Sequence, residues 1–196
     1  DPGRTIVHLH GYTKALTVSP VRRARRMGYA AICTLHDFFS ACPNGAYFDY
    51  RRGQPCARRA LSLSCMTAHC DKRHYAHKMF RVGRGLIQRH IGNFPNTVEH
   101  YVALSNRSAE VLAPYLPKTA ELHHLENAID WQRPAPADPA RHDTILFIGR
   151  LDREKGVLLL ADAVERLGMR ATFVGEGPLR PQLENRTGIN LTGWVE

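Results

Sequence analysis

Short apolar runs alternate along the chain with longer segments in which apolar residues recur every three or four positions. The short runs predict buried strands at residues 5–10, 30–35, 101–104, 121–125, 144–148, 170–174 and 189–192. The periodic segments predict helices at residues 20–27, 71–91, 156–167 and 178–185, with one more capped by Ser105. Alternating strands and helices predict parallel sheets with helices on both faces, which is the α/β fold class.

Two segments interrupt this alternation. Residues 38–70 contain Cys, Gly and Pro without clean periodicity, and we interpret them as an irregular insertion. Residues 131–143 contain three prolines and predict a linker, after which the strand and helix pattern restarts. The sequence therefore predicts two domains, at residues 1–128 and 129–196.

The charge is unevenly distributed between these two domains. The chain has 196 residues, 43% of them hydrophobic, and a net charge of +9, so a packed core is expected. Residues 1–128 hold 18 Lys and Arg against 8 Asp and Glu, whereas residues 129–196 hold 9 against 10. The basic first domain fits a phosphate-bearing partner, such as a lipid diphosphate, a membrane surface or nucleic acid. A solvated, arginine-rich surface explains the same charge.

The sequence begins without a signal-peptide pattern or an initiator Met, and no apolar run is long enough to span a membrane. A strand pattern starts almost at once, so we interpret the sequence as part of a longer chain.

Polar residues gather where the predicted strands end. In parallel sheets, ligands bind beyond the carboxyl ends of the strands, so these positions are the first candidates for a site. They are His10, His36, Asp37, Ser105, Asn127, Arg150, Gly175 and Glu176.

The loop after residues 144–148 carries the strongest chemical signal. Gly149 permits a close turn, and Arg150 and Lys155 precede a helix that begins near Gly156. Two cations beside a helix N-terminus suit a diphosphate and would neutralise the charge on a leaving nucleoside diphosphate. An ordinary loop with exposed charges is the alternative.

Two further strand ends give weaker signals. Gly175, Glu176 and Gly177 form a Gly-x-Gly turn that permits close backbone approach to a ligand, or is a plain tight turn. His36 can hydrogen-bond a sugar hydroxyl or transfer a proton, although a single His is more often structural.

Four cysteines lie close together in the insertion. Cys42, Cys56, Cys65 and Cys70 could close a structural zinc site, but they lack the paired C-x2-C spacing that makes this pattern specific. Scattered reduced thiols explain them equally well, and disulfides less well. Cys33 lies within an apolar run and is expected to be an inert buried thiol.

Taken together, these motifs resemble glycosyltransferase family 4, the group 1 glycosyltransferases. The insertion resembles a subset of bacterial members that act on surface polysaccharides. The resemblance covers nearly the whole chain. The motifs that carry it are His8–Gly11, Thr34–Asp37, Asn127–Asp130, Gly149–Gly156, Val174–Leu179 and Leu191–Val195.

The resemblance implies a GT-B fold, in which two Rossmann-like domains face each other, both incomplete in this chain. Residues 1–128 would be the later part of the acceptor-side domain, with His10, Gly11 and Asp37 on the acceptor side and His36 catalytic. Residues 129–196 would open the donor-side domain.

On the donor side, the family pattern implies that Gly149, Arg150, Lys155, Gly175, Glu176 and Gly177 contact the donor. The implied reaction moves a sugar from a nucleotide-diphosphate sugar to a glycan or polyprenyl-diphosphate-linked acceptor, with retention and no metal needed for catalysis. The implied location is cytoplasmic, or peripheral at the inner face of an anionic membrane, and no nucleic acid is expected as a partner.

The sequence also departs from the family pattern. The family's glycine-rich loop is not in this sequence, and the expected pair of glutamates would lie beyond Glu196. We therefore expect the isolated chain to be inactive, and robust sugar transfer by the purified chain would refute this. The alternatives are a zinc-stabilised module that binds nucleic acid and another sugar-nucleotide enzyme, such as an epimerase.

Overall fold

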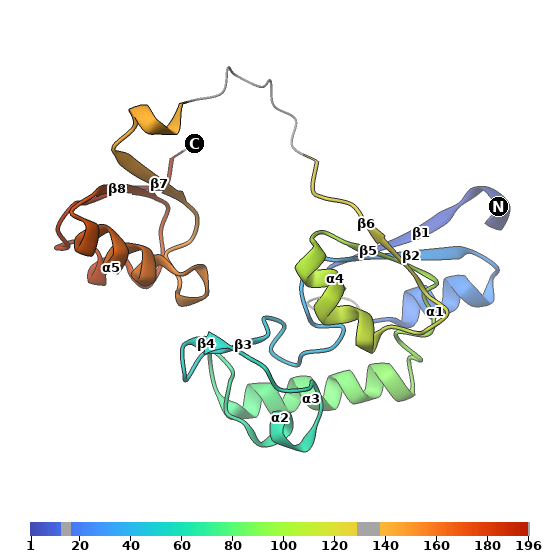
Figure 1. The fold of residues 1–196 in the computed structure, drawn as a ribbon. Coiled ribbons are helices and arrows are strands. Elements are labelled where there is room, and N and C mark those ends of the chain that lie inside the picture. Colours follow the sequence, from blue (N-terminus) through green and yellow to red (C-terminus); the bar gives the residue numbers. More distant parts are fainter. Residues whose placement is uncertain (13–16, 129–137, 196) are drawn as a thin grey trace. The chain divides into compact units, whose positions relative to one another are not determined.

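The computed structural model describes residues 1–12, 17–128 and 138–195, and divides into two compact units (Figure 1). Unit 1 comprises Asp1–Ile129 and unit 2 comprises Asp130–Glu196. The boundary is one residue from the predicted one. Most of the predicted linker lies outside the described residues, apart from a 3-10 helix at Pro139–Arg141.

Unit 1 is built on a four-stranded parallel sheet with the strand order β1-β2-β5-β6. Its helices and strands are β1 (Ile6–His10), α1 (Ser19–Arg26), β2 (Ala30–Leu35), β3 (Phe48–Asp49), β4 (Gln54–Pro55), α2 (Leu63–Thr67), α3 (Tyr75–His90), β5 (His100–Ala103), α4 (Asn106–Leu112) and β6 (Glu121–His124). Two 3-10 helices span Pro2–Arg4 and Ala113–Tyr115.

One face of this sheet packs on the core, and the other carries exposed side chains. Leu9, Ala31 and Cys33 belong to the buried cluster, together with Tyr101 and Leu112. Burial raises the pKa of the Cys33 thiol to about 12, in keeping with the inert thiol expected there. Strand residues alternate between faces, so the exposed His8 and His10 of β1, and the exposed Glu121 and His123 of β6, lie on the side away from this cluster.

Unit 2 is a three-stranded parallel sheet with the strand order β7-β8-β9. Its elements are β7 (Thr144–Ile148), α5 (Val157–Leu167), β8 (Arg170–Val174) and β9 (Ile189–Gly193), with 3-10 helices at Arg153–Lys155 and Arg180–Gln182. Helix α5 buries Val157, Ala161 and Val164, which are spaced by three or four residues, against Phe173 of β8.

The α/β class with parallel sheets is confirmed, and one element prediction is wrong. The helix predicted at residues 178–185 is only a 3-10 turn, Arg180–Gln182, because Pro181 lacks a backbone donor and restricts the residue before it. The region predicted as irregular contains the β3–β4 hairpin and α2. In the parts of the chain that the structure describes, no helix is long and apolar enough to cross a membrane.

Candidate functional site

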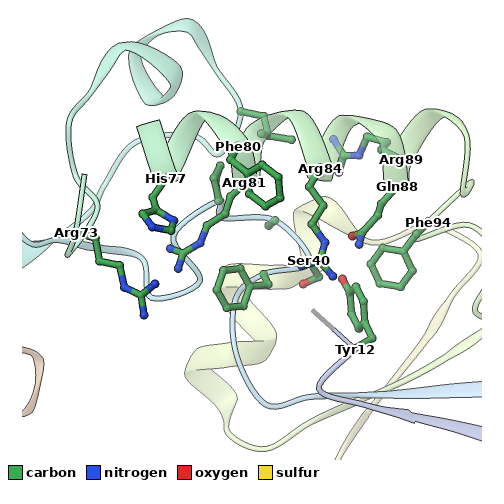
Figure 2. A pocket seen from close by; sticks show the side chains of 15 residues that line it. Tyr12, Ser40, Arg73, His77, Phe80, Arg81, Arg84, Gln88, Arg89 and Phe94 are labelled. Carbon is green, nitrogen blue, oxygen red and sulfur yellow. The ribbon is translucent and has the colours of Figure 1, made fainter. Parts of the chain in front are cut away.

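A pocket of about 400 Å³ in unit 1 lies between helix α3 and the loop after β2 (Figure 2). Tyr12 follows β1 and Ser40 follows β2, so the pocket opens at the carboxyl ends of two neighbouring parallel strands. This is where parallel sheets bind ligands. The lining residues are Tyr12, Phe39, Ser40, Ala41, Pro43, Leu61, Arg73, His77, Phe80, Arg81, Arg84, Gly85, Gln88, Arg89 and Phe94.

Helix α3 supplies the cationic side of this pocket. Arg81, Arg84 and Gln88 are spaced by three and four residues, which places them on one face of the helix. Figure 2 shows these side chains directed from α3 toward the loop. Among the described residues that line the pocket there are four arginines and no acidic side chain. The pocket therefore favours an anionic ligand.

Arg81 has a structural role in addition to lining the pocket. Its Nη1 lies 2.6 Å from Oδ2 of Asp71, whose side chain is 1% exposed. This pair fixes the start of α3 to the preceding loop and holds the Arg81 guanidinium at the pocket.

Three buried polar atoms in the pocket have no hydrogen-bond partner among the described residues. They are Oη of Tyr12, Oγ of Ser40 and Nε2 of Gln88. Figure 2 shows that the side chains of Tyr12 and Gln88 lie near Arg84 and Phe94. Each unsatisfied buried group costs roughly 1–3 kcal/mol, and such groups are usually bonded to water or to a ligand. Water or a polar ligand in the pocket would satisfy these three atoms.

The Tyr12 hydroxyl is a permanent neutral hydrogen-bonding group. Burial raises its pKa far above the usual range, and the charges of Cys33 and Asp37 raise it further, while Arg84 opposes them. The phenol is therefore protonated at physiological pH and can donate a hydrogen bond into the pocket.

Four of the predicted residues of unit 1 lie together at the same sheet edge, namely His10, Gly11, His36 and Asp37. His10 Nδ1 is 2.7 Å from His36 Nε2, and the tautomer decides which of the two donates. A small cavity is lined by Gly11, His36 and Asp37, and it shares Tyr12 and Ser40 with the larger pocket. Asp37 accepts a hydrogen bond from the Phe39 amide at 3.0 Å and so shapes the loop between the two.

His8 lies next to this histidine pair on β1. Its Nε2 is 2.8 Å from Oγ1 of Thr34. Desolvation lowers the pKa of His8, and the charges of His10 and His36 lower it further. Protonation of His8 is therefore disfavoured beside the histidine pair.

In unit 2, the predicted cations lie in the exposed loop between β7 and α5. Arg150 pairs with Asp152 and Glu154, each at 3.2 Å, and its side chain is 66% exposed. Lys155 directly precedes Gly156, which is the N-cap of α5 and has a φ of 71°. The side chains of Asp152 and Glu154 are only 5% and 19% exposed, so a diphosphate would compete with two largely buried carboxylates for Arg150.

The predicted glycines of unit 2 have a structural reason to be glycine. A Cβ on Gly175 would lie 2.1 Å from the Gly149 carbonyl oxygen, and one on Gly177 would lie 2.5 Å from that of Leu151. These contacts pack the loop after β7 against the loop after β8. Glu176 pairs with Arg180 at 2.8 Å. Glycine is needed at these positions because the loops after β7 and β8 pack closely on each other, whether or not a ligand binds.

The four cysteines of the insertion form no disulfide with one another in the structure, and Asn44 hydrogen-bonds to two of them. Cys42 Sγ donates to Asn44 Oδ1 at 3.1 Å, and Asn44 Nδ2 donates to the Cys70 carbonyl at 3.1 Å. Burial raises the pKa of the Cys42 and Cys70 thiols, and the Lys78 ammonium opposes this at Cys70. Within the described ranges, three potential ligand atoms lie within 4.8 Å of one another at His100, Glu121 and His123, and not among the cysteines. A zinc site at the cysteines stays a prediction.

Several arginines of unit 1, which a nucleic-acid-binding module would use to contact phosphates, hold parts of the fold together instead. Arg22 donates to the Ile91 carbonyl, Arg25 pairs with Glu99, and Arg58 pairs with Asp49 at 2.9 Å. These guanidiniums tie elements of unit 1 together, which weakens the nucleic-acid alternative.

The pocket on α3 was not predicted from the sequence. Tyr12, Ser40 and Gln88 do not stand out in the sequence pattern, and the arginines of the helix are what a solvated face would also carry. The spacing of Arg81, Arg84 and Gln88 indicates that they share one face of a helix. Only the fold shows that this face meets the loop after β2.

The sequence matches no model of a known protein family and no curated protein. Among solved structures, the chain is similar to S. aureus TarM, in a mutant complex with fondaparinux, alpha-GlcNAc-glycerol and UDP. The identity is 10%, the TM-score is 0.46, and the match covers 86% of this chain and 29% of TarM. It is also similar to the lipopolysaccharide outer core galactosyltransferase WaaB in its apo form, with 13% identity, a TM-score of 0.48, and coverage of 97% of this chain and 44% of WaaB. The chain thus spans less than half of either protein, and at TM-scores below 0.5 neither similarity informs the roles of individual residues.

Proposed function

We propose that this chain is part of a glycosyltransferase of GT-B type, resembling family 4, that moves a sugar from a nucleotide-diphosphate sugar to a glycan or polyprenyl-diphosphate-linked acceptor. The observation that carries the proposal is the cationic pocket of unit 1, with its three unpartnered polar atoms among the described residues, at the carboxyl ends of β1 and β2. The transfer retains anomeric configuration and uses protein cations in place of a catalytic metal. Its place is surface polysaccharide synthesis.

The pocket of unit 1 is the acceptor site in this proposal. Guanidinium groups such as Arg84 suit the phosphates of a lipid-linked acceptor, since their planar donors match phosphate oxygens. Aromatic side chains such as Phe94 suit a sugar ring or a prenyl chain. The Tyr12 hydroxyl and the Gln88 amide would take the remaining hydrogen bonds of the ligand.

In this proposal, His36 meets the reacting sugar. It lies at the end of β2, lines the small cavity beside the acceptor pocket, and is hydrogen-bonded to His10 at 2.7 Å. A histidine held in this way can accept a hydroxyl hydrogen bond or transfer a proton. In the proposed enzyme it contacts the transferred sugar, and Gly11 and Asp37 shape the adjoining loops.

Unit 2 is the donor-binding part in this proposal. Arg150 and Lys155 hold the diphosphate at the start of α5, where the helix dipole also favours negative charge. The loop containing Gly175, Glu176 and Gly177 supplies backbone groups for the nucleoside. The ion pairs of Arg150 with Asp152 and Glu154 give way when the diphosphate binds.

Donor binding tests the proposal directly. Titration of the chain with UDP and GDP, followed by thermal shift and calorimetry, should show stabilisation by one of the two. Arg150→Ala and Lys155→Ala should each weaken this binding by about tenfold or more, which is the loss of one charged hydrogen bond. Arg153→Ala is the matched control, because Arg153 is an exposed cation in the same loop. Equal effects of all three variants, or no nucleotide binding, would refute the donor assignment.

We further propose that unit 1 works at the inner face of an anionic membrane, where polyprenyl-linked acceptors reside. Helix α3 exposes Phe80 and Ile87, and Ile91 is exposed directly after it, so the three are spaced to form one apolar stripe beside the arginine face. An apolar stripe flanked by arginines suits a helix that lies in the headgroup region. The protein would then be cytoplasmic and peripheral.

A further inference from the structure

Three potential metal ligands lie on the open face of the sheet in unit 1, away from the pocket. His100 begins β5, and Glu121 and His123 lie on the neighbouring strand β6. His100 is the register partner of Glu121, and Glu121 and His123 are two residues apart, so all three side chains leave the same face. Leu122, between them, packs on the core on the opposite face.

The ligand atoms of these side chains are close together. His100 Nδ1 lies 3.3 Å from His123 Nε2 and 3.5 Å from Glu121 Oε2, and His123 Nε2 lies 3.8 Å from the same oxygen. Tetrahedral zinc with ligands at about 2.0–2.1 Å requires its donor atoms to lie roughly 3.3–3.4 Å apart. Rotation of the exposed Glu121 side chain would close the small remaining difference.

We propose that His100, Glu121 and His123 bind a Zn²⁺ ion that joins β5 to the edge strand β6. Two imidazoles and one carboxylate suit zinc, whereas Mg²⁺ and Ca²⁺ prefer oxygen ligands alone. Three protein ligands leave the fourth tetrahedral position for water. This site is independent of the transferase proposal and distinct from the zinc predicted at the cysteines.

Zinc should stabilise the sheet because it binds the folded chain and not the unfolded one. A ligand that binds the native state raises the unfolding temperature according to its concentration relative to Kd. The zinc ion would hold β5 and β6 together, and the edge strand β6 would gain most from it.

The experiment titrates the full chain with ZnCl₂ in competition with a chromophoric chelator and follows the unfolding temperature. His123→Ala and Glu121→Gln should each weaken zinc binding by at least about tenfold, since losing even an outer-shell partner costs about 10–100-fold. His124→Ala is the matched control, because it removes an exposed histidine of the same strand whose side chain leaves the other face. Its zinc affinity should be that of the wild type.

Cobalt substitution separates this site from the cysteines. Co²⁺ bound to two imidazoles and a carboxylate gives visible bands without the near-ultraviolet charge-transfer band of a thiolate. The expected result is a visible spectrum that His123→Ala abolishes and His124→Ala preserves. Zinc affinity unchanged in His123→Ala and Glu121→Gln, with both folded by circular dichroism, would overturn the proposal, as would cobalt bands of thiolate type alone.

Discussion

Tyr12 and Tyr101 are both buried in unit 1, but their hydroxyl groups are in different situations. Tyr101 donates to the Pro95 carbonyl at 2.6 Å, whereas the Tyr12 hydroxyl has no partner among the described residues. A buried hydroxyl with a partner contributes to stability, and one without a partner costs free energy. The Tyr12 hydroxyl is therefore available to a ligand. Removing this hydroxyl should affect ligand binding without lowering the stability of the fold.

Tyr12→Phe should leave the free energy of unfolding unchanged or raise it by up to about 1 kcal/mol, because an unsatisfied hydroxyl is lost. Tyr101→Phe should lower it by about 1–3 kcal/mol, since it leaves the Pro95 carbonyl unsatisfied. Urea unfolding measures both. Tyr12→Phe should also weaken binding of a short-chain prenyl diphosphate. If Tyr12→Phe destabilises the chain as much as Tyr101→Phe, the pocket assignment loses its main support.

Asp49 is a buried carboxylate whose charge stabilises the insertion. Its side chain is 5% exposed, and it accepts hydrogen bonds from Arg58 and from the amides of Arg51 and Arg52. Burial alone would raise the pKa of Asp49, but Arg58 and the two amides outweigh it and lower the pKa below its usual range.

Asp49→Asn should lower the free energy of unfolding at neutral pH by about 1–3 kcal/mol, because a charged hydrogen-bond acceptor is removed. The native pKa is lower than the unfolded one of about 3.9, so this stability is present above that value and is lost as the pH falls through the native pKa. The variant should therefore lose less stability than the wild type on acidification below about pH 4. Asp138→Asn, at an exposed pair with Arg141, is the control and should have little effect at either pH.

At the scale of helices and loops, the same residue type has different consequences. Gly175 has a φ of 134° and faces the Gly149 carbonyl, whereas Gly83 lies within α3, where an added Cβ would meet no described atom within 4 Å beyond its own helix backbone. Residue 175 must be glycine because a side chain would clash with the Gly149 carbonyl and would be strained at this φ. At residue 83, glycine only weakens the helix.

Gly175→Ala should destabilise unit 2 by several kcal/mol or prevent its folding, because its Cβ would meet backbone rather than a movable side chain. Gly83→Ala should stabilise the chain by about 0.5–1 kcal/mol, since alanine favours the helix. Circular dichroism and thermal unfolding measure both. A Gly175→Ala variant that unfolds like the wild type would contradict the observed packing of the two loops.

The insertion is held by buried polar contacts that end on helix α3. Lys78, fully buried, donates to the carbonyls of Cys65 and Ala68, and Arg81 pairs with Asp71 at 2.6 Å. These contacts join the Cys-containing segment to α3. Metal analysis of the purified chain tests whether zinc adds to them.

Across the whole molecule, charge is concentrated in one unit. Unit 1 carries 18 Lys and Arg against 8 Asp and Glu, and unit 2 carries 9 against 10. A basic surface near an anionic membrane gains attraction that salt weakens, since the interaction is screened within about a Debye length.

The chain should co-sediment with vesicles that contain phosphatidylserine and not with neutral vesicles, and this binding should fall as salt is raised from about 0.05 to about 0.5 M. Phe80→Ser with Ile87→Ser should reduce binding further, because it removes the apolar stripe of α3. Leu159→Ser, at an exposed leucine of unit 2, is the control. Equal binding to neutral and anionic vesicles would contradict the membrane proposal.

The sequence by itself determined the parallel α/β architecture and most of its elements. Apolar runs identified the sheet strands to within one or two residues, because each strand turns apolar side chains toward the core. The sequence also placed His10, His36 and Arg150 at strand ends, since the order of strand, loop and helix fixes which residues lie just beyond each strand. It could not tell that Pro181 limits the predicted last helix to a 3-10 turn.

Only the tertiary structure decided which polar groups are buried and which meet. Tyr12, Ser40 and Gln88 are far apart in the sequence. Only the packing of α3 over the loop after β2 brings together their polar atoms, which have no partner in the described part of the chain. His100 and His123 likewise come together only through the register of β5 and β6. The physical reason is that periodicity records which face of an element is apolar, whereas a site depends on which faces of different elements are brought together.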